Sequence, residues 1–67
     1  MDVTIYTTAT CPRCKILKAK MDDKGIKYKE VSDELILEAE TIDVVPVLEV
    51  NGKRMGFREG NDWINKE

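Results

Sequence analysis

Two cysteines are the residues of this chain whose type and spacing point to chemistry. Cys11 and Cys14 enclose Pro12 and Arg13 and follow an apolar, β-branched segment. Residues three apart on a helix are neighbours, with about 5–6 Å between Cβ atoms, so the two thiols can form a disulfide after a small local adjustment. A thiol at a helix N-terminus faces unpaired N–H groups and the positive end of the helix dipole, which favour the thiolate that attacks disulfides. We therefore predict that Cys11 is an exposed nucleophile and that Cys14 is the resolving thiol, directed toward the core.

The cysteine pair lies at the start of a strongly basic stretch. Seven of the eleven basic residues fall within residues 13–29, whereas residues 30–49 hold seven acidic residues and no basic one. The positive charges of Arg13, Lys15 and Lys18 are expected to lower the pKa of the nucleophilic thiol further. The charge separation has two compatible interpretations. The charges form solvated faces that keep a small domain soluble, or a basic helix attracts acidic partners to the reactive site.

The composition excludes several other uses of two cysteines. The chain has no histidine, so it lacks the ligands for an ordinary four-ligand zinc site within one chain and the general base of Cys-His and Ser-His-Asp hydrolases. Two alternatives remain beside a redox pair. In one, the cysteines of two chains hold a metal or an iron–sulfur cluster, which would make the protein a binding module. In the other, both cysteines are inert core residues, although a proline between them at a strand-to-helix turn argues against this.

The length and charge limit the organisation and the partners of the chain. Its 67 residues allow one small domain, which we take to span residues 1–67 without linkers or repeats. The net charge of −2 gives no reason to expect nucleic acid or an anionic membrane as partner. There is no apolar run of about 18 residues that would span a membrane, and the chain begins without the basic and apolar stretches of a signal peptide. We expect a cytoplasmic monomer that binds neither a metal nor a cofactor.

The hydrophobic pattern predicts alternating strands and helices around the cysteine pair. In chain order these are a strand at 3–6, a helix from Pro12 to a cap at Gly25, a strand at 26–31, a helix at 34–40, paired strands at 47–50 and 53–55, and a helix at 62–64. Asn51-Gly52 is a strong hairpin signal between the paired strands. The β-α-β-α-β-β-α order predicts an α/β, thioredoxin-like fold, in which a four-stranded mixed sheet carries helices on both faces.

Apolar spacing and capping residues refine the predicted helices. The apolar stripe of the first helix consists of Cys14, Leu17 and Met21. The apolar side of the second helix consists of Leu35, Ile36 and Ala39. Ser32 or Asp33 is expected to cap that second helix, residues 56–60 are expected to form a loop, and Asn61 is expected to cap the last helix.

Short motifs spread over nearly the whole chain resemble the glutaredoxin-like branch of the thioredoxin superfamily. In order they are Ile5-Tyr6-Thr7, Cys11-Pro12-Arg13-Cys14, Gly25-Ile26-Lys27-Tyr28, Val45-Pro46-Val47 and Gly56-Phe57-Arg58. The last motif looks more like the redoxins that serve ribonucleotide reductase, the NrdH-redoxins. The resemblance implies a small thiol-disulfide oxidoreductase without a bound cofactor. Its substrates would be ribonucleotide reductase, other protein disulfides or glutathione mixed disulfides.

The resemblance also implies a set of substrate-binding residues. The Val45–Pro46 peptide would be cis and lie against the active-site disulfide, leaving the backbone of Val45 free to pair with a substrate peptide or with glutathione. In the alternative, Pro46 simply begins an edge strand. Gly56, Phe57 and Arg58 complete the expected substrate-binding set, although an aromatic residue such as Phe57 also suits the core of a small domain.

The expected electron donor depends on two departures from the glutaredoxins that use glutathione. Residues 7–10 lack the lysine that those proteins carry before the first cysteine, and Gly56-Phe57-Arg58 stands where they have a glycine pair followed by an aspartate. These departures favour thioredoxin reductase or another protein reductant. A glutathione-dependent glutaredoxin is the alternative, with Arg58 or Lys15 as partner for a glutathione carboxylate.

Arg13 is a third departure, since aromatic or small residues are usual between the proline and the second cysteine. A positive charge at this position stabilises the thiolate and therefore the reduced form of the pair. We therefore expect a redox couple more oxidising than that of thioredoxin, whose potential is about −270 mV.

Overall fold

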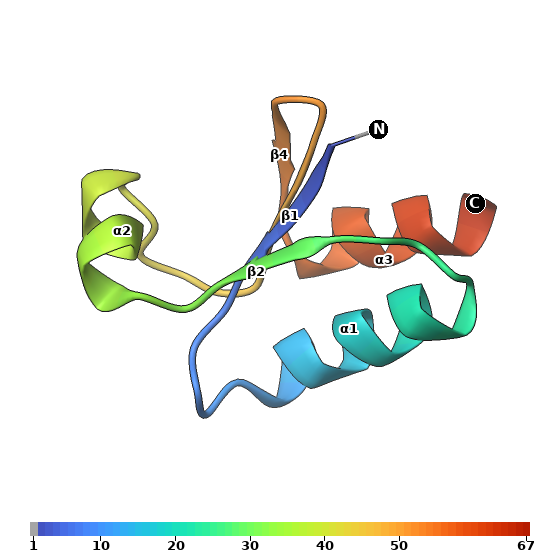
Figure 1. The fold of residues 1–67 in the computed structure, drawn as a ribbon, viewed down its shortest axis with the longest axis horizontal. Coiled ribbons are helices and arrows are strands. Elements are labelled where there is room, and N and C mark those ends of the chain that lie inside the picture. The colour runs from blue at the N-terminus through green and yellow to red at the C-terminus, as the bar shows by residue number, and fades with distance from the viewer. Residues whose placement is uncertain (1) are drawn as a thin grey trace.

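The order of strands and helices follows the predicted order. The computed structural model describes residues 2–67. Its elements are β1 (Val3–Tyr6), α1 (Pro12–Asp23), β2 (Lys29–Val31), α2 (Glu34–Ala39), β3 (Val47–Val50), β4 (Lys53–Met55) and α3 (Phe57–Lys66) (Figure 1). Within this part of the chain, no helix is long and apolar enough to cross a membrane.

The four strands form one mixed sheet in the order β2-β1-β3-β4. β1 pairs with β2 in parallel and with β3 antiparallel, and β3 pairs antiparallel with β4. The β3–β4 turn is made by Asn51 and Gly52, both with positive φ, 50° and 87°. Such φ values belong to the two-residue turn that Asn-Gly favours, so the predicted hairpin is confirmed. The mixed sheet with its three helices also confirms the predicted thioredoxin-like fold.

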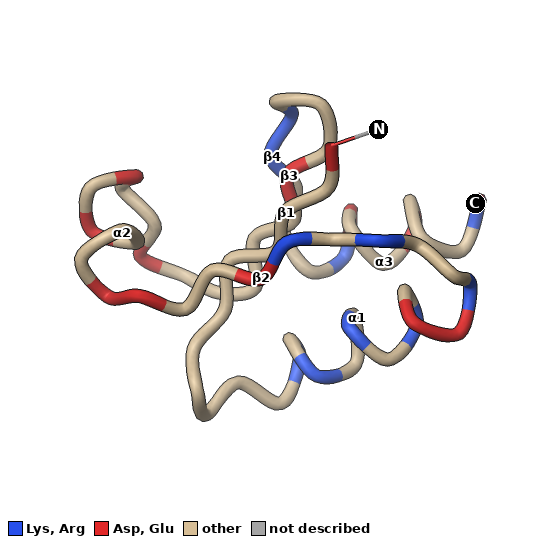
Figure 2. Tube along the Cα trace, in the orientation of Figure 1, with Lys and Arg blue, Asp and Glu red and all other residues tan. Residues whose placement is uncertain are grey.

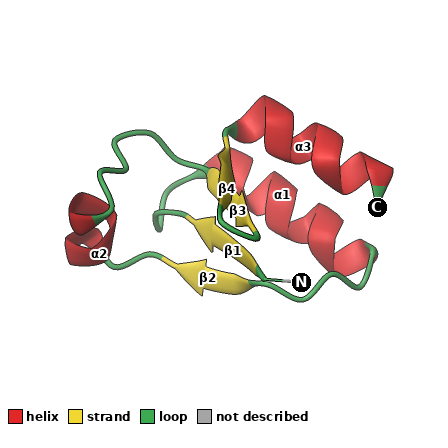
Figure 3. Ribbon diagram, turned by 90° about the horizontal axis from the view of Figure 1, so that it is seen from above, coloured by secondary structure: helices red, strands yellow, loops and turns green. Residues whose placement is uncertain are grey.

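One face of the sheet carries the hydrophobic core. The core residues of the strands and of the two longer helices are Val3, Ile5, Leu17, Met21, Leu48, Val50, Met55 and Ile64. α1 and α3 lie side by side against this face (Figures 1 and 3). The predicted stripe of α1 is confirmed, because Cys14, Leu17 and Met21 are its buried residues.

α1 ends as predicted, and its end shortens the next strand. Gly25 has a φ of 69°, which a glycine adopts without a steric penalty. The N–H groups of Gly25 and Ile26 donate to the carbonyls of Asp22 and Met21 at 3.1 and 2.9 Å. The backbone of Ile26 is thus used by the helix end, so the strand predicted at 26–31 begins only at Lys29.

The short helix α2 is placed differently from the two longer ones. It lies beyond the carboxyl ends of β1 and β2, at one end of the sheet face opposite α1 and α3 (Figure 3). Asp33 caps it by accepting a hydrogen bond from the Leu35 N–H at 2.9 Å. Figure 2 shows acidic residues gathered around α2 and basic residues along α1, with the loop from β1 to α1 between them.

The predicted apolar side of α2 was wrong. Its buried residue is Leu37, whereas Leu35 is 76% exposed, Ile36 is 44% exposed and Ala39 is also exposed. A helix of six residues that stands beyond the strand ends has room to bury only one position against the rest of the protein.

The last helix is longer than predicted. α3 begins at Phe57 with Gly56 as its N-cap, so residues 57–60 are helical, and Asn61 lies inside the helix instead of capping it. The glycine at position 60 suggested a loop, but Gly60 is buried against the sheet. A Cβ atom at this position would lie 3.3 Å from Leu48 Cβ and 3.7 Å from Leu17 Cδ1. Close packing of α3 onto β3 and α1 therefore outweighs the weak helix propensity of glycine.

We predict that Gly60→Val destabilises the fold, because its side chain has no room between α3 and Leu48. The free energy of unfolding should fall by about 1–3 kcal/mol, as is usual for overpacked core positions. Urea unfolding followed by circular dichroism measures it. The control is Asp62→Val on the exposed side of the same helix, which should change stability by only about 0.5 kcal/mol. Equal losses in both variants would show that the close approach at Gly60 is not limiting.

Candidate active site

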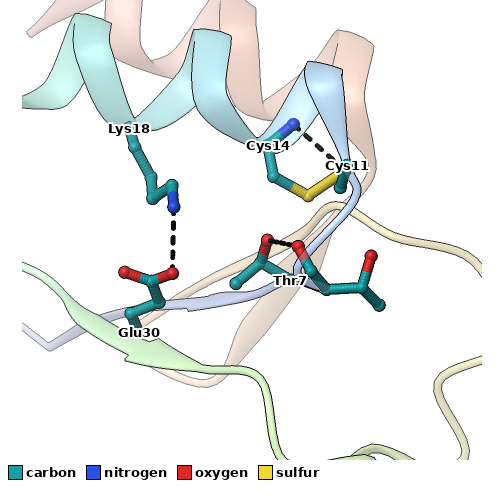
Figure 4. A network of polar contacts seen from close by, with 6 residues as sticks. Thr7, Cys11, Cys14, Lys18 and Glu30 are labelled. Carbon is teal, nitrogen blue, oxygen red and sulfur yellow. Dashed lines mark hydrogen bonds and ion pairs between the residues drawn. A yellow bond between two sulfur atoms is a disulfide. The ribbon is translucent and has the colours of Figure 1, made fainter.

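Cys11 occupies the N-cap position of α1. Its backbone is extended, with φ −111° and ψ 100°, and Pro12 takes the first helical position, where a missing N–H costs no hydrogen bond. The backbone N–H of Cys14 donates to Cys11 Sγ at 3.1 Å (Figure 4). The sulfur thus fills the place of the side-chain oxygen that normally caps a helix. In the reduced protein this donor and the helix dipole favour negative charge on Cys11.

The two cysteines form a disulfide across the first turn of the helix (Figure 4). Their Cα atoms lie 5.3 Å apart, within the range that a disulfide requires. Cys14 is 1% exposed and Cys11 is 7% exposed. The prediction of an exposed Cys11 was therefore wrong, because the residues around the N-cap cover most of its surface.

A shallow cavity of about 440 Å³ gives access to this site. It is lined by Thr8, Thr10, Cys11, Pro12, Arg13 and Val45. Cys14 does not belong to this lining and lies on the core side of the helix. Of the two cysteines, Cys11 is thus the one that lines the cavity.

The segment before β3 supplies one residue to the lining of this cavity. The Val45–Pro46 peptide is cis, as the family resemblance implied. Val45 is half-buried and lines the cavity, whereas Pro46 is buried and does not. The structure therefore brings Val45 to the same cavity as Cys11, whereas Pro46 lies outside the lining of that cavity.

A second hollow of about 820 Å³ adjoins the first. Gly56, Phe57 and Arg58 line it at the start of α3, together with Glu59, Asn61, Asp62 and Arg13. Arg13 lies over the Phe57 ring, 5.3 Å from its centroid, and borders both hollows. The residues predicted from the Gly-Phe-Arg motif thus lie next to the cysteine cavity but not inside it. Phe57 also packs against the core, as its aromatic side chain suggested, and its role in substrate binding stays a prediction.

Two threonines before Cys11 belong to the site although they were not among the predicted site residues. Thr8 and Thr10 line the cysteine cavity. Thr7 is 1% exposed, and its hydroxyl donates to the Thr8 carbonyl at 3.2 Å (Figure 4). The available signal was the run of hydroxyl residues between a strand and a reactive cysteine, since such side chains hydrogen-bond to a nearby backbone.

The basic residues near the cysteines are not equivalent. Lys18 pairs with Glu30 of β2 at 2.9 Å, so its expected effect on Cys11 is offset by a neighbouring carboxylate (Figure 4). Arg13 and Lys15 form no ion pair within residues 2–67. In the same part of the chain, no three His, Cys, Asp or Glu side chains lie together as a metal site would require.

We predict that Arg13→Ala makes the cysteine couple more reducing, because it removes a positive charge next to the thiolate. The pKa of the Cys11 thiol should rise in the reduced protein, and the potential should fall by roughly 10–20 mV, the equivalent of a weak exposed charge interaction. Alkylation rates against pH and equilibration with a glutathione buffer measure the two quantities. Lys27→Ala removes a charge away from the site and is the control. The proposed effect of Arg13 is contradicted if both variants shift the potential equally. It is also contradicted if the redox potential of the unsubstituted protein is clearly below about −270 mV.

Comparison with known proteins identifies similar sequences and structures. The glutaredoxin family model matches residues 3–55, which include both cysteines and Val45-Pro46. No curated protein matches this chain. A solved structure of NrdH-redoxin from Escherichia coli, a glutaredoxin-like protein with a thioredoxin-like activity profile, is 27% identical with a TM-score of 0.75. The match covers 98% of this chain and 93% of that chain.

A second solved structure shares the fold alone. Leishmania TDR1, a trimeric glutathione transferase, is 20% identical to this chain with a TM-score of 0.79. The match covers the whole of this chain but 17% of TDR1. The present fold therefore corresponds to one part of that larger protein.

Proposed function

The chain belongs to the glutaredoxin family and is a thiol-disulfide oxidoreductase, and on this premise we propose that it reduces protein disulfides with Cys11 as nucleophile and Cys14 as resolving thiol. One observation carries this assignment. Cys11 lines the cavity and accepts a backbone N–H at a helix N-terminus, whereas Cys14 is 1% exposed behind it.

The proposed reaction has two exchange steps. The Cys11 thiolate attacks one sulfur of the substrate disulfide, and the other substrate sulfur leaves as a thiolate that takes up a proton. The product of this step is a mixed disulfide. Cys14 then loses its proton and attacks the Cys11 sulfur, which releases the second substrate thiol and leaves Cys11–Cys14 oxidised. Two electrons pass from the dithiol to the substrate, and an external reductant restores the dithiol.

Substrate binding is proposed to use the walls of the two hollows. Val45 precedes β3 and lines the cysteine cavity, and this supports a role for its backbone in pairing with an extended peptide that carries the disulfide. Gly56, Phe57, Arg58 and Arg13 would contact the peptide beyond the disulfide. The proposed active form is a monomer.

We propose thioredoxin reductase or another protein as the electron donor. The absence of lysine in residues 7–10 and the Gly56-Phe57-Arg58 motif support this, as does the likeness to a redoxin with a thioredoxin-like activity profile. Ribonucleotide reductase is the substrate that the NrdH-like motif suggests. A glutathione-dependent activity is the second candidate, since Arg13 and Arg58 line the hollow at the start of α3, where a carboxylate of glutathione would be stabilised.

We predict different effects for the two cysteine substitutions. Cys11→Ser should abolish reduction of insulin, because no thiol would then line the cavity. Cys14→Ser should also abolish it, since the mixed disulfide is no longer resolved, but should leave a stable adduct that mass spectrometry detects. Persistent reduction of a glutathionylated peptide by Cys14→Ser would support the glutathione-dependent candidate. Turnover of insulin by Cys11→Ser would contradict the assignment of the nucleophile.

A coupled assay tests the electron donor. NADPH consumption is measured with thioredoxin reductase alone and, separately, with glutathione plus glutathione reductase. We expect faster turnover with thioredoxin reductase. Faster turnover with glutathione would instead establish the second candidate. A coloured or metal-containing purified protein would point to the binding-module alternative, in which the cysteines of two chains share a metal or cluster.

A further inference from the structure

The cysteine cavity is built from two segments that follow different elements. Residues 8–13 come after β1, and Val45 belongs to the segment 41–46 that joins α2 to β3. The distance between Cys11 and Val45 therefore depends on how the segment 41–46 is held. The end of this segment is held by β3, which follows it directly. The contacts at its beginning, near Thr41, are therefore the ones that remain to be identified.

Little packing holds the beginning of this segment. α2 buries only Leu37 and lies beyond the strand ends (Figure 3). A separate hollow of about 350 Å³ lies between residues 41–44 and the side of β4 that carries Arg54. The segment is thus not pressed onto the sheet by a continuous layer of side chains.

The backbone at Thr41 is also strained. Its φ is 59°, a left-handed conformation that is unusual for a β-branched residue. The N–H groups of Thr41 and Ile42 donate back to Glu38 and Leu37 at 3.1 and 2.9 Å. Such a conformation persists only when the surroundings hold it, so other contacts near Thr41 gain importance.

Arg54 of β4 supplies these contacts. Its Nη1 donates to the Glu40 carbonyl at 2.8 Å, which is the carbonyl of the peptide leading into Thr41. Its Nη2 also pairs with the Glu40 carboxylate. The guanidinium is held from the sheet side, because Nε donates to Glu49 of β3 at 3.0 Å and the group lies over the Tyr6 ring, 5.6 Å from its centroid.

These contacts connect the two segments that form the cavity. Tyr6 is the last residue of β1, and the chain continues from it into the loop that carries Cys11. Glu40 directly precedes the segment that carries Val45. The planar guanidinium offers donors in several directions at once, which a lysine ammonium on its flexible stem does not reproduce. Hydrogen bonds to Glu49 and Glu40 raise the pKa of Arg54, so it stays charged.

We propose that Arg54 is a positioning residue: by joining Glu40, Glu49 and Tyr6 it holds the segment 41–46, and with it Val45, at the distance from Cys11 that a peptide substrate needs. The inference rests on the proposed role of Val45 in substrate binding. Arg54 itself lines neither of the two hollows beside Cys11. It should therefore affect the affinity for a protein substrate without changing the reactivity of the thiol.

Arg54→Ala tests this with insulin as the protein disulfide. The KM for insulin should rise roughly five- to tenfold, in the range of known long-distance couplings, while kcat stays within about twofold. The alkylation rate of reduced Cys11 and the reduction of bis(2-hydroxyethyl) disulfide, which is too small to need Val45, should not change. Lys53→Ala, on the same strand and with one weak ion pair to Glu59 at 3.8 Å, is the control.

Arg54→Lys and a spectroscopic measurement separate positioning from stability. Lysine keeps the positive charge but lacks the several fixed N–H donors of the guanidinium, so Arg54→Lys should restore only part of the affinity for insulin. In Arg54→Ala the amide resonances of residues 41–46 should shift or broaden, while those of α1 stay in place. The proposal is wrong if the KM of Arg54→Ala matches that of Lys53→Ala, or if Arg54→Lys restores the KM of the unsubstituted protein fully. It is also wrong if the alkylation rate of Cys11 in Arg54→Ala falls together with the melting temperature.

The same measurements distinguish a failure of the proposed function from a failure of the positioning role of Arg54. If the unsubstituted protein does not reduce insulin, the proposed function fails, but the resonances of residues 41–46 still test whether Arg54 holds this segment. If insulin is reduced and those resonances do not respond to Arg54→Ala, the positioning role alone fails. Should Arg54→Ala not fold, Arg54→Lys and Glu40→Ala replace it, each expected to raise KM to a smaller extent.

Discussion

The sulfur of Cys11 at the N-cap of α1 is the feature around which the site is arranged. A helix start leaves backbone N–H groups without partners, and here the N–H of Cys14 is satisfied by sulfur instead of oxygen. The same geometry places the second cysteine one turn along the helix, on its buried side. Capping and thiolate stabilisation are therefore one interaction: the N–H that is satisfied at the helix start also favours the charged form of Cys11, the proposed nucleophile.

The position of this helix start depends on packing behind it. Leu17 and Met21 anchor α1 to the sheet, and Gly60 allows α3 to approach Leu48 closely. Because α3 lies so near, its first residues come within reach of Arg13, whose guanidinium rests on Phe57. The cysteine cavity and the hollow at the start of α3 are thus joined through one arginine, and a small core holds both.

The opposite side of the site is held by polar contacts. α2 contributes one buried residue and leaves Leu35 and Ile36 exposed, so hydrophobic burial does little to place it. Arg54 of β4 donates a hydrogen bond to Glu40 at the end of α2 and lies over the ring of Tyr6, the last residue of β1. A domain of this size buries a smaller fraction of its surface than a larger one, and here hydrogen bonds from Arg54 to Glu40 and Glu49 contribute to holding the end of α2.

The sequence by itself determined the features that depend on a few neighbouring residues. A β-branched strand, a proline after Cys11 and a glycine at position 25 are local signals, and with Asn51-Gly52 they predicted the element order, the cysteine turn and the hairpin. The tertiary structure decided what depends on residues far apart in the chain. Gly60 is helical and packs against Leu48, Cys11 is 7% exposed although it occupies a helix cap, and α2 buries Leu37 while it leaves Leu35 and Ile36 exposed. Local propensity is weak compared with burial and close packing, so the sequence alone could not settle these points.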